Sequence, residues 1–383
     1  MKASEKAKTV MTFDKTDSQA LKGVAILFML FHHCYYSVDR FERYDVDFLP
    51  LSMEQAMDLA MFFKICVALF VFISSYGITV SFQRNGDSPA AMRKNISGRY
   101  ITMMTGYWFV FLLSCIAFAF LDPMHFVTYY TRDNPASTVV NVIFDALGIS
   151  FLCDTPTLNP TWWYISFAIV LIAVIPLFIR LYKRYGAIPA LIVAFFLRYA
   201  FVRHNFEITR YLMIMVLGII CADRNYLGRA RQTRWVKFAP VDYILKTVVL
   251  TAILHLMFFA RVQERVSPNN TEIRDGIIPL FVVFYCYMVI FPIKPVKKIL
   301  EFLGKHSMNI FLTHTFLRVN FLSGFIYSFK NAYLIVAVLL ATSLALALAI
   351  YGLEKLVRLD RLIAWLKKKA FAGIDAMYAK EQP

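Results

Sequence analysis

Ten apolar stretches, separated by charged segments, dominate this 383-residue sequence. Hydrophobic residues make up 59% of the chain and charged residues 17%, which gives more apolar surface than a soluble domain can bury. Most of the stretches reach the roughly 17 to 25 residues that a helix needs to cross a bilayer. The sequence therefore predicts an all-α, polytopic membrane protein with ten transmembrane helices, at residues 20–38, 59–82, 100–121, 162–181, 187–202, 211–222, 242–260, 276–292, 306–327 and 333–354.

The positive charge follows the predicted topology. The formal net charge is +16, and a basic patch of that size would suggest a nucleic-acid partner. Most lysines and arginines instead lie in alternate loops and in the two tails, which the positive-inside rule places in the cytoplasm. We therefore expect a surrounding lipid bilayer, two cytoplasmic termini and no nucleic-acid partner.

The segment VVNVIFDALGISFL (139–152) is too short to span a membrane comfortably. Counting it as a span would also place the basic loops RLYKRYG and GRARQTRWVK outside. We interpret it as a re-entrant or interfacial segment on the outer side. The predicted organisation is thus a cytoplasmic tail at 1–19, one membrane domain at 20–354, and a cytoplasmic tail at 355–383 that lies along the membrane surface.

Five basic residues fall inside the predicted spans, and these spans offer almost no acidic partner: Lys22, Lys64, Arg198, Lys246 and Arg318. An unpaired lysine or arginine near a helix centre costs roughly 2.5 to 3.5 kcal/mol. The missing anion can be a ligand, or the long side chains can reach the headgroups. The six cysteines are scattered without a CxxC pair and the histidines lack metal-binding spacing, so we predict neither disulfides nor a metal site.

The first span, within LKGVAILFMLFHHCY (21–35), places Lys22 and His33 on one helix face. Eleven residues at about 100° each bring the two within roughly 20° of each other, about 16 Å apart along the axis, while His32 points some 80° away. A long anionic molecule entering from the cytoplasm would meet the lysine first and the imidazole with its far end. A lysine that reaches the headgroups and a histidine packed in the core would show the same spacing, so both interpretations stay open.

Six segments resemble, in the right order, motifs of the acyltransferase-3 family of bacterial integral-membrane O-acyltransferases. The stretch from Lys22 to His33 is similar to the family's opening motif of arginine, ten residues and histidine. The other five are FVFISSYGI (70–78), RYITMMTGYW (99–108), NPTWWYIS (159–166), YLMIMVLGIICADRN (211–225) and LGKHSMNIFLTHTF (303–316). The resemblance extends over residues 18–354.

The sequence departs from the family pattern at several positions. Lys22 stands where arginine is usual, which keeps the charge but loses the planar fork that binds phosphate through two hydrogen bonds. Thr102 stands where a second basic residue of the third span is common, so Arg99 is the cation carried over there. Ser75 replaces a common glycine, and no glutamate follows Trp163.

The resemblance implies transfer of an acyl group, which we expect to be acetyl, from cytoplasmic acyl-CoA. His33 would be the base, because an imidazole titrates near neutral pH, and Lys22 and Arg99 would bind the donor's phosphates. The expected co-substrate is acetyl-CoA, with no bound cofactor, and the expected location is the bacterial cytoplasmic membrane.

The acceptor is expected to be a hydroxyl group of a cell-surface polysaccharide or of its lipid-linked precursor. The ten spans take up almost the whole sequence, which favours a reaction completed within the membrane domain. Weaker candidates for the acceptor site are Trp162, Trp163, Ser307 and His314. A core histidine and an interfacial aromatic belt are the alternative interpretations of the histidine and the tryptophans.

A transporter or flippase for an anionic or lipid-linked sugar is the main alternative function, because intramembrane cations can line the path of an anionic cargo. The sequence shows no inverted repeat and no matched pair of Gly/Pro-broken helices, which are common in transporters. A non-catalytic scaffold would leave the charge pattern unexplained. Transfer of a labelled acyl group would distinguish an enzyme from a transporter.

Overall fold

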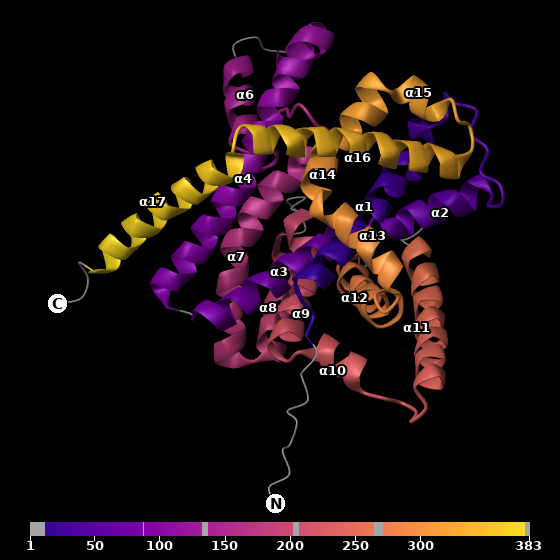
Figure 1. The fold of residues 1–383 in the computed structure, drawn as a ribbon, viewed down its shortest axis with the longest axis vertical. Helices are drawn as coiled ribbons and strands as arrows, with labels where there is room; N and C mark the ends of the chain where they lie inside the picture. The colour runs from indigo at the N-terminus through magenta and orange to yellow at the C-terminus, as the bar shows by residue number, and fades with distance from the viewer. Residues whose placement is uncertain (1–11, 87, 132–136, 202–206, 264–270, 380–383) are drawn as a thin grey trace, which may run out of the picture. The chain divides into compact units, whose positions relative to one another are not determined.

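The computed structural model describes residues 12–86, 88–131, 137–201, 207–263 and 271–379 (Figure 1). These residues are all helical apart from loops and one isolated bridge between Asp47 and Asn331, and no β-strand occurs among them. The predicted all-α class is therefore confirmed. The chain divides into two compact units, and residues 1–11 and 380–383 of the predicted tails lie outside the described part.

The first unit comprises Met1–Ala25, Lys64–Gly77 and Tyr185–Lys305. Helices α9 and α12 form its centre, and α8 and α11 pack against them. It contains the first parts of α1 (Lys15–Tyr35) and α3 (Cys66–Asn85), followed by α8 (Ala187–Phe201), η6 (Glu207–Tyr211), α9 (Leu212–Asp223), α10 (Tyr226–Gln232), α11 (Ala239–Val262), α12 (Thr271–Tyr285), the π-helical turn η8 (Cys286–Ile290) and α13 (Lys294–Lys305).

Two glycines let α1 and α13 cross at close range within this unit. A Cβ atom on Gly23 would lie 2.9 Å from the Cα atom of Leu300 and still closer to its carbonyl oxygen. A Cβ atom on Gly304 would collide with the backbone of Gln19 in the same way. Small residues at such crossings allow two backbones to approach, which is a common way to pack membrane helices.

The second unit comprises Ile26–Phe63, Ile78–Arg184 and His306–Pro383. Its core includes Tyr107, Trp162, Leu312 and Phe316. It contains the later parts of α1 and α3, followed by η1 (Val38–Arg40), α2 (Met53–Phe63), α4 (Pro89–Leu121), α5 (Pro123–Thr131), α6 (Thr138–Ala146), η3 (Ser150–Cys153), η4 (Pro160–Trp162), α7 (Trp163–Tyr185), α14 (Ser307–Thr315), the π-helical turn η9 (Phe316–Phe321), α15 (Ser323–Tyr327), α16 (Ala332–Leu356) and α17 (Leu359–Ala379).

Capping residues determine where the long helices of this unit begin. The Ser88 hydroxyl accepts the backbone N–H of Ala91 at the start of α4, and Pro89 supplies a residue with a suitable φ at the first helical position. The helix ends at Leu121, shortly before Pro123, because proline disfavours helical geometry in the residue that precedes it. Asn331 caps α16 by accepting from the backbone of Tyr333 and Leu334.

Within the part of the chain that the structure describes, six helical segments are long and apolar enough to cross a membrane: Met53–Asn85, Pro89–Leu121, Pro160–Tyr185, Ala239–Val262, Ile273–Ile290 and Ala332–Leu356. A pair bent by 61°, Thr209–Asp223 and Tyr226–Gln232, would make a seventh. The count of ten spans stays a prediction, because the first predicted span, in α1, is not among these segments and the fifth and sixth correspond to the shorter helices α8 and α9. The ninth, 306–327, is divided among α14, η9 and α15.

The long helices expose many large apolar side chains, whose contact with water would be unfavourable. On α11, Ile244, Val248 and Leu256 are 60%, 60% and 70% exposed. Every backbone group inside a helix is hydrogen-bonded, so such helices can present apolar side chains to lipid. Together with their lengths, this identifies a multi-pass membrane protein.

The segment 139–152 forms a short helix and a turn. Helix α6 has nine residues, which corresponds to about 13 Å and is too short to cross a bilayer. Gly148 follows it with φ +70°, a left-handed conformation that glycine adopts without a steric penalty. The interfacial or re-entrant placement of this segment stays a prediction.

The C-terminal helix α17 packs along α4 (Figure 1). The ammonium group of Lys94 lies 2.5 Å from a carboxylate oxygen of Asp375, and the ring of Phe371 lies against Gly98. The tail that the sequence places along the membrane surface is therefore attached to the N-terminal half of α4.

Candidate active site

Two histidines from distant parts of the sequence meet in the second unit. His33 lies near the C-terminal end of α1, and His314 lies near the end of α14. Their ring centroids are 5.0 Å apart and the ring planes are inclined by 40°. The structure therefore brings together the predicted base and one of the predicted acceptor-site residues.

His314 is held by hydrogen bonds on both ring nitrogens. Its Nδ1 atom lies 3.1 Å from the carbonyl oxygen of Ile310 and 2.8 Å from that of Phe311. Carbonyl oxygens only accept, so Nδ1 carries a hydrogen and donates. The Nε2 atom lies 3.2 Å from the hydroxyl of Thr315. With no exposed surface, His314 is a fixed part of this site.

A chain of polar contacts links His314 to the segment before α7. The hydroxyl of Thr315 lies 3.5 Å from the hydroxyl of Thr161. The Thr161 hydroxyl in turn donates to the side-chain oxygen of Asn159 at 2.8 Å. The amide nitrogen of Asn159 donates to the carbonyl oxygen of Leu312 at 3.1 Å, and the indole N–H of Trp162 donates to the same oxygen at 3.0 Å. Buried polar groups that satisfy one another in this way fix the position of η4 against α14.

Arg40 adds a positive charge next to His33. Its Nη1 atom donates to the carbonyl oxygens of His32 and His33, at 3.2 Å each, at the C-terminal end of α1, where carbonyl groups commonly accept from side chains. The same atom lies 3.5 Å from Nδ1 of His33, the outer limit for a hydrogen bond. Burial and then the charge of Arg318 lower the pKa of Arg40 from its usual value.

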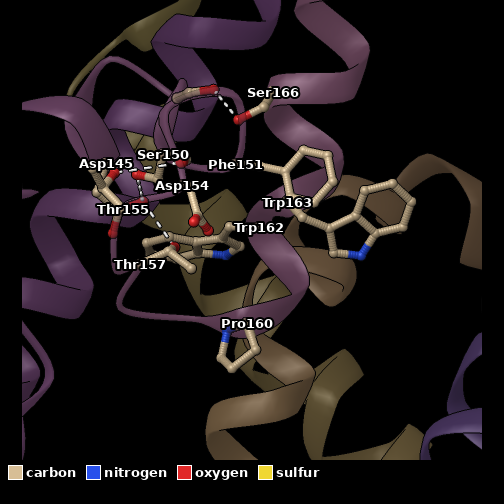
Figure 2. A pocket seen from close by; sticks show the side chains of 11 residues that line it. Asp145, Ser150, Phe151, Asp154, Thr155, Thr157, Pro160, Trp162, Trp163 and Ser166 are labelled. Carbon is tan, nitrogen blue, oxygen red and sulfur yellow. Dashed lines mark hydrogen bonds between the residues drawn. The ribbon is translucent and has the colours of Figure 1, made fainter. Parts of the chain in front are cut away.

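A pocket of about 250 Å³ lies between the α6–η3 segment and the start of α7 (Figure 2). Figure 2 shows polar side chains, including Ser150, Thr155 and Thr157, on one side and the rings of Phe151 and Trp163 on the other. Trp162, whose ring is buried, contributes the adjoining wall. Both predicted acceptor-site tryptophans therefore line one pocket.

Asp145 organises the polar side of this pocket. Its carboxylate accepts hydrogen bonds from the hydroxyl of Tyr130 at 2.5 Å, the backbone N–H of Leu158 at 2.7 Å and the hydroxyl of Thr157 at 2.8 Å. Burial raises the pKa of this carboxyl, while these donors act in the opposite direction. So many donors on one carboxylate indicate that Asp145 shapes the pocket wall.

Asp154 is the other carboxylate of the pocket, and it is exposed. Its backbone is left-handed, with φ of 51°, a conformation that aspartate tolerates better than most residues. An exposed carboxylate beside aromatic rings can accept hydrogen bonds from a ligand's hydroxyl groups.

The other predicted site residues lie elsewhere. Ser307 is at the opposite end of α14 from His314, about 10 Å along the helix. Lys22 is half-buried in the first unit, and Arg99, half-buried in the second, donates from Nε to the side chain of Asn95 at 2.9 Å. His32 packs against α2, with Nδ1 2.8 Å from the carbonyl oxygen of Ala60. Across the described ranges, no three His, Cys, Asp or Glu side chains form a group that could hold a metal ion.

Sequence reasoning missed several residues of this site. Arg40 was not singled out, because it follows the end of the first predicted span at residue 38. Asn159 stands directly before a proline, a typical position for a residue that caps a helical turn, which could have singled it out. Asp145 lies within the short segment 139–152 and was not singled out.

A comparison with protein families identifies the chain. Residues 16–352 match the family model of the acyltransferase domain of the acyltransferase-3 family. No curated protein and no solved structure matches the chain. Because the matched region covers most of the sequence and includes every residue of the site described above, this protein belongs to the acyltransferase-3 family.

Proposed function

We propose that this membrane acyltransferase moves an acyl group, expected to be acetyl, from acyl-CoA to a hydroxyl group of a glycan, with His33 as the base. The observation that carries the proposal is the pairing of His33 with His314, which is itself linked to the wall of the aromatic pocket. A base must lie within reach of the proton that it removes, so geometry is the first criterion.

His33 is better suited than His314 to act as the base. Both nitrogens of His314 have hydrogen-bonding partners, and the side chain has no exposed surface. His33 is only half-buried, and its Nδ1 atom has a long contact to Arg40 that a substrate hydroxyl can replace. We therefore assign proton transfer to His33 and the positioning of its ring to His314.

The proposed reaction is a direct transfer. The acceptor oxygen attacks the thioester carbonyl carbon while its proton moves to the imidazole of His33. The carbon–sulfur bond then breaks and the coenzyme A sulfur takes the proton from the imidazolium. An ester and free coenzyme A result, and His33 returns to its neutral form. A covalent acyl-histidine would be an alternative route through the same residue.

The donor is proposed to enter from the cytoplasm, with its phosphates on Lys22 and Arg99. Lys22 precedes His33 by eleven residues on the same helix, about 16 Å along the axis. A long acyl-CoA donor could therefore bind with its phosphates near Lys22 and its thioester near His33. The contact of α17 with the N-terminal half of α4 supports a common side for the C-terminus and the loop before α4, and we propose the cytoplasmic side of a bacterial inner membrane.

The pocket between the α6–η3 segment and the start of α7 is proposed to hold a sugar ring of the acceptor. The rings of Phe151 and Trp163 provide apolar faces, and Asp154 and Thr155 provide polar groups for hydroxyls. This combination of a mostly apolar wall and a few polar groups is typical of small-molecule sites. A cell-surface polysaccharide or its lipid-linked precursor would present such a ring.

Labelled acyl-CoA, purified protein in lipid and a mixture of glycan acceptors test the proposal. We expect labelled ester to form, and His33→Ala to lower its rate by roughly 100- to 10,000-fold, the usual contribution of a positioned base. The mutant should still retain labelled acyl-CoA, because donor binding is assigned elsewhere.

His32→Ala is the matched control, because His32 packs against α2 and should tolerate loss of its ring much better. Full activity in a well-folded His33→Ala protein would refute the mechanism. Movement of unmodified glycan across the membrane, with no ester formed, would indicate a transporter.

A further inference from the structure

Arg318 is an intramembrane cation with a buried hydrogen-bond donor that the described residues leave unsatisfied. Lys246 lies 2.7 Å from a carboxylate oxygen of Asp242, and Lys64 is close enough to Asp275 to act on its charge. Lys22 and Arg198 also interact with neighbouring groups. The buried Nε atom of Arg318 has no hydrogen-bond partner among the residues that the structure describes, while the side chain also interacts with Tyr327. A buried donor left in this way is costly unless a ligand satisfies it.

Arg318 and Arg40 share one site with the two histidines. The charges of both arginines act on His33, and the charge of Arg318 acts on Arg40. Asp39 lies near both arginines, but it is exposed, so water screens its charge. The site therefore gathers two guanidinium groups next to the proposed base, with one exposed carboxylate near them.

The backbone places Arg318 in this position through an unusual turn. Residues Phe316–Phe321 form the π-helical turn η9, directly after the helix that carries His314. Such turns are rare and occur often at functional sites. An arginine on this turn, next to a proposed catalytic pair, favours a role in substrate binding over simple packing.

We infer that Arg40 and Arg318 bind an oxyanion, a carboxylate or a phosphate group, that the acceptor carries close to the hydroxyl group being acylated. The inference rests on the proposed function and specifies the acceptor's chemical class. Guanidinium groups are well matched to oxyanions because their N–H groups can donate in pairs.

The phosphates of the acyl donor and a lipid headgroup are less suitable ligands for Arg40 and Arg318. Along α1, Lys22 precedes His33, whereas Arg40 follows it, so the donor's phosphates are assigned to the other side of the base. A headgroup on Arg40 would lie within a few ångströms of Nδ1 of His33 and would block the approach of a hydroxyl. An oxyanion that arrives with the acceptor avoids both conflicts.

The same oxyanion would assist the chemistry. Protonation of His33 adds a third positive charge beside two guanidinium groups, which opposes proton transfer. A bound carboxylate or phosphate offsets those charges and makes the imidazolium easier to form. An anionic acceptor should therefore react with a higher kcat as well as a lower KM.

Acceptor competition tests the inference. Methyl glucoside, methyl glucuronide and glucose 6-phosphate are compared as acceptors at fixed acetyl-CoA. At least one anionic acceptor should exceed the neutral one in kcat/KM by tenfold or more. Arg318→Gln should reduce that reaction by about 10- to 100-fold and so remove the preference for the anionic acceptor over the neutral sugar. Arg361→Gln, on the exposed face of α17, is the matched control and should change neither.

A binding measurement separates this inference from the proposed function. Each sugar is added to purified protein and the thermal midpoint of unfolding is recorded, because a ligand of the native state raises it. Stabilisation by an anionic sugar that is lost in Arg318→Gln supports the inference, even if no transfer occurs and the proposed function fails.

Three results would overturn the inference. The first is equal transfer to neutral and anionic acceptors, which would leave the acyltransferase assignment intact. The second is stabilisation by inorganic phosphate alone to the same extent as by glucose 6-phosphate, which would indicate a general anion site. The third is stabilisation that follows added phosphatidylglycerol and not the sugars, which would indicate a headgroup site.

Discussion

Replacing Gly23 with alanine tests whether close packing of α1 on α13 holds the residues around Lys22 in place. The new Cβ atom would lie 2.9 Å from the Cα atom of Leu300, and real Cβ atoms essentially never come within 3.0 Å of another heavy atom. The obstacle is backbone, so no side-chain rotation can relieve it and the two helices must separate.

The expected cost follows from two opposing effects. Overpacking of a close contact costs typically 1 to 3 kcal/mol, and we expect the upper end because both partners are backbone. Alanine gains about 1 kcal/mol over glycine within a helix. The net loss in the free energy of unfolding should be about 2 kcal/mol, together with a higher KM for acyl-CoA because Lys22 is the adjacent residue.

Gly77→Ala is the matched control in the same unit, because a Cβ atom there would meet nothing within 4 Å. This change should leave the protein equally stable or stabilise it by up to about 1 kcal/mol. Unfolding of both variants in mixed detergent micelles, followed by circular dichroism, gives the comparison. A Gly23→Ala protein as stable as Gly77→Ala would show that the crossing does not need glycine.

Two further predictions concern the donor and the pocket. Lys22→Ala should raise the KM for acyl-CoA by about 10- to 150-fold, the loss of one charge-assisted hydrogen bond, while Lys22→Arg retains activity; full activity of Lys22→Ala at limiting donor in a transfer assay would contradict this. Asp145→Asn should lower the free energy of unfolding by about 2 to 3 kcal/mol, as measured by thermal unfolding. The new side-chain NH2 group would face the O–H of Tyr130 or the N–H of Leu158, which are themselves donors. Asp154→Asn should leave stability unchanged, and equal stability of the two variants would refute the role of Asp145.

Long uniform apolar stretches could be located from the sequence. The predicted spans 162–181, 242–260 and 333–354 correspond to α7, α11 and α16, whose ends extend by a few residues to caps and prolines. In these helices apolar composition, length and capping residues all agree. Composition says less about 306–327, where α-helix and π-helical turn have the same apolar content and differ only in backbone hydrogen bonding.

The candidate site was only partly predictable for a similar reason. His33 and His314 could each be singled out by residue type and by resemblance, but their contact depends on how α1 and α14 pack, which neither local sequence encodes. Arg40 and Asn159 lie in loops or short turns, where hydropathy has no period to detect. Residues that act through tertiary hydrogen bonds are therefore the ones that sequence reasoning missed.

The π-helical turn at Phe316–Phe321 also affects how this chain should be aligned with its relatives. A turn of this kind holds about one residue more than an α-helical turn, so deleting one residue there would rotate the following segment by about 100° and shorten it by about 1.5 Å. In a relative whose corresponding segment is an unbroken α-helix, an alignment without a gap would pair Arg318 with a residue on another face. A one-residue gap within 316–321 would restore the correspondence, and substitution patterns at Arg318 should be read only after that gap is placed.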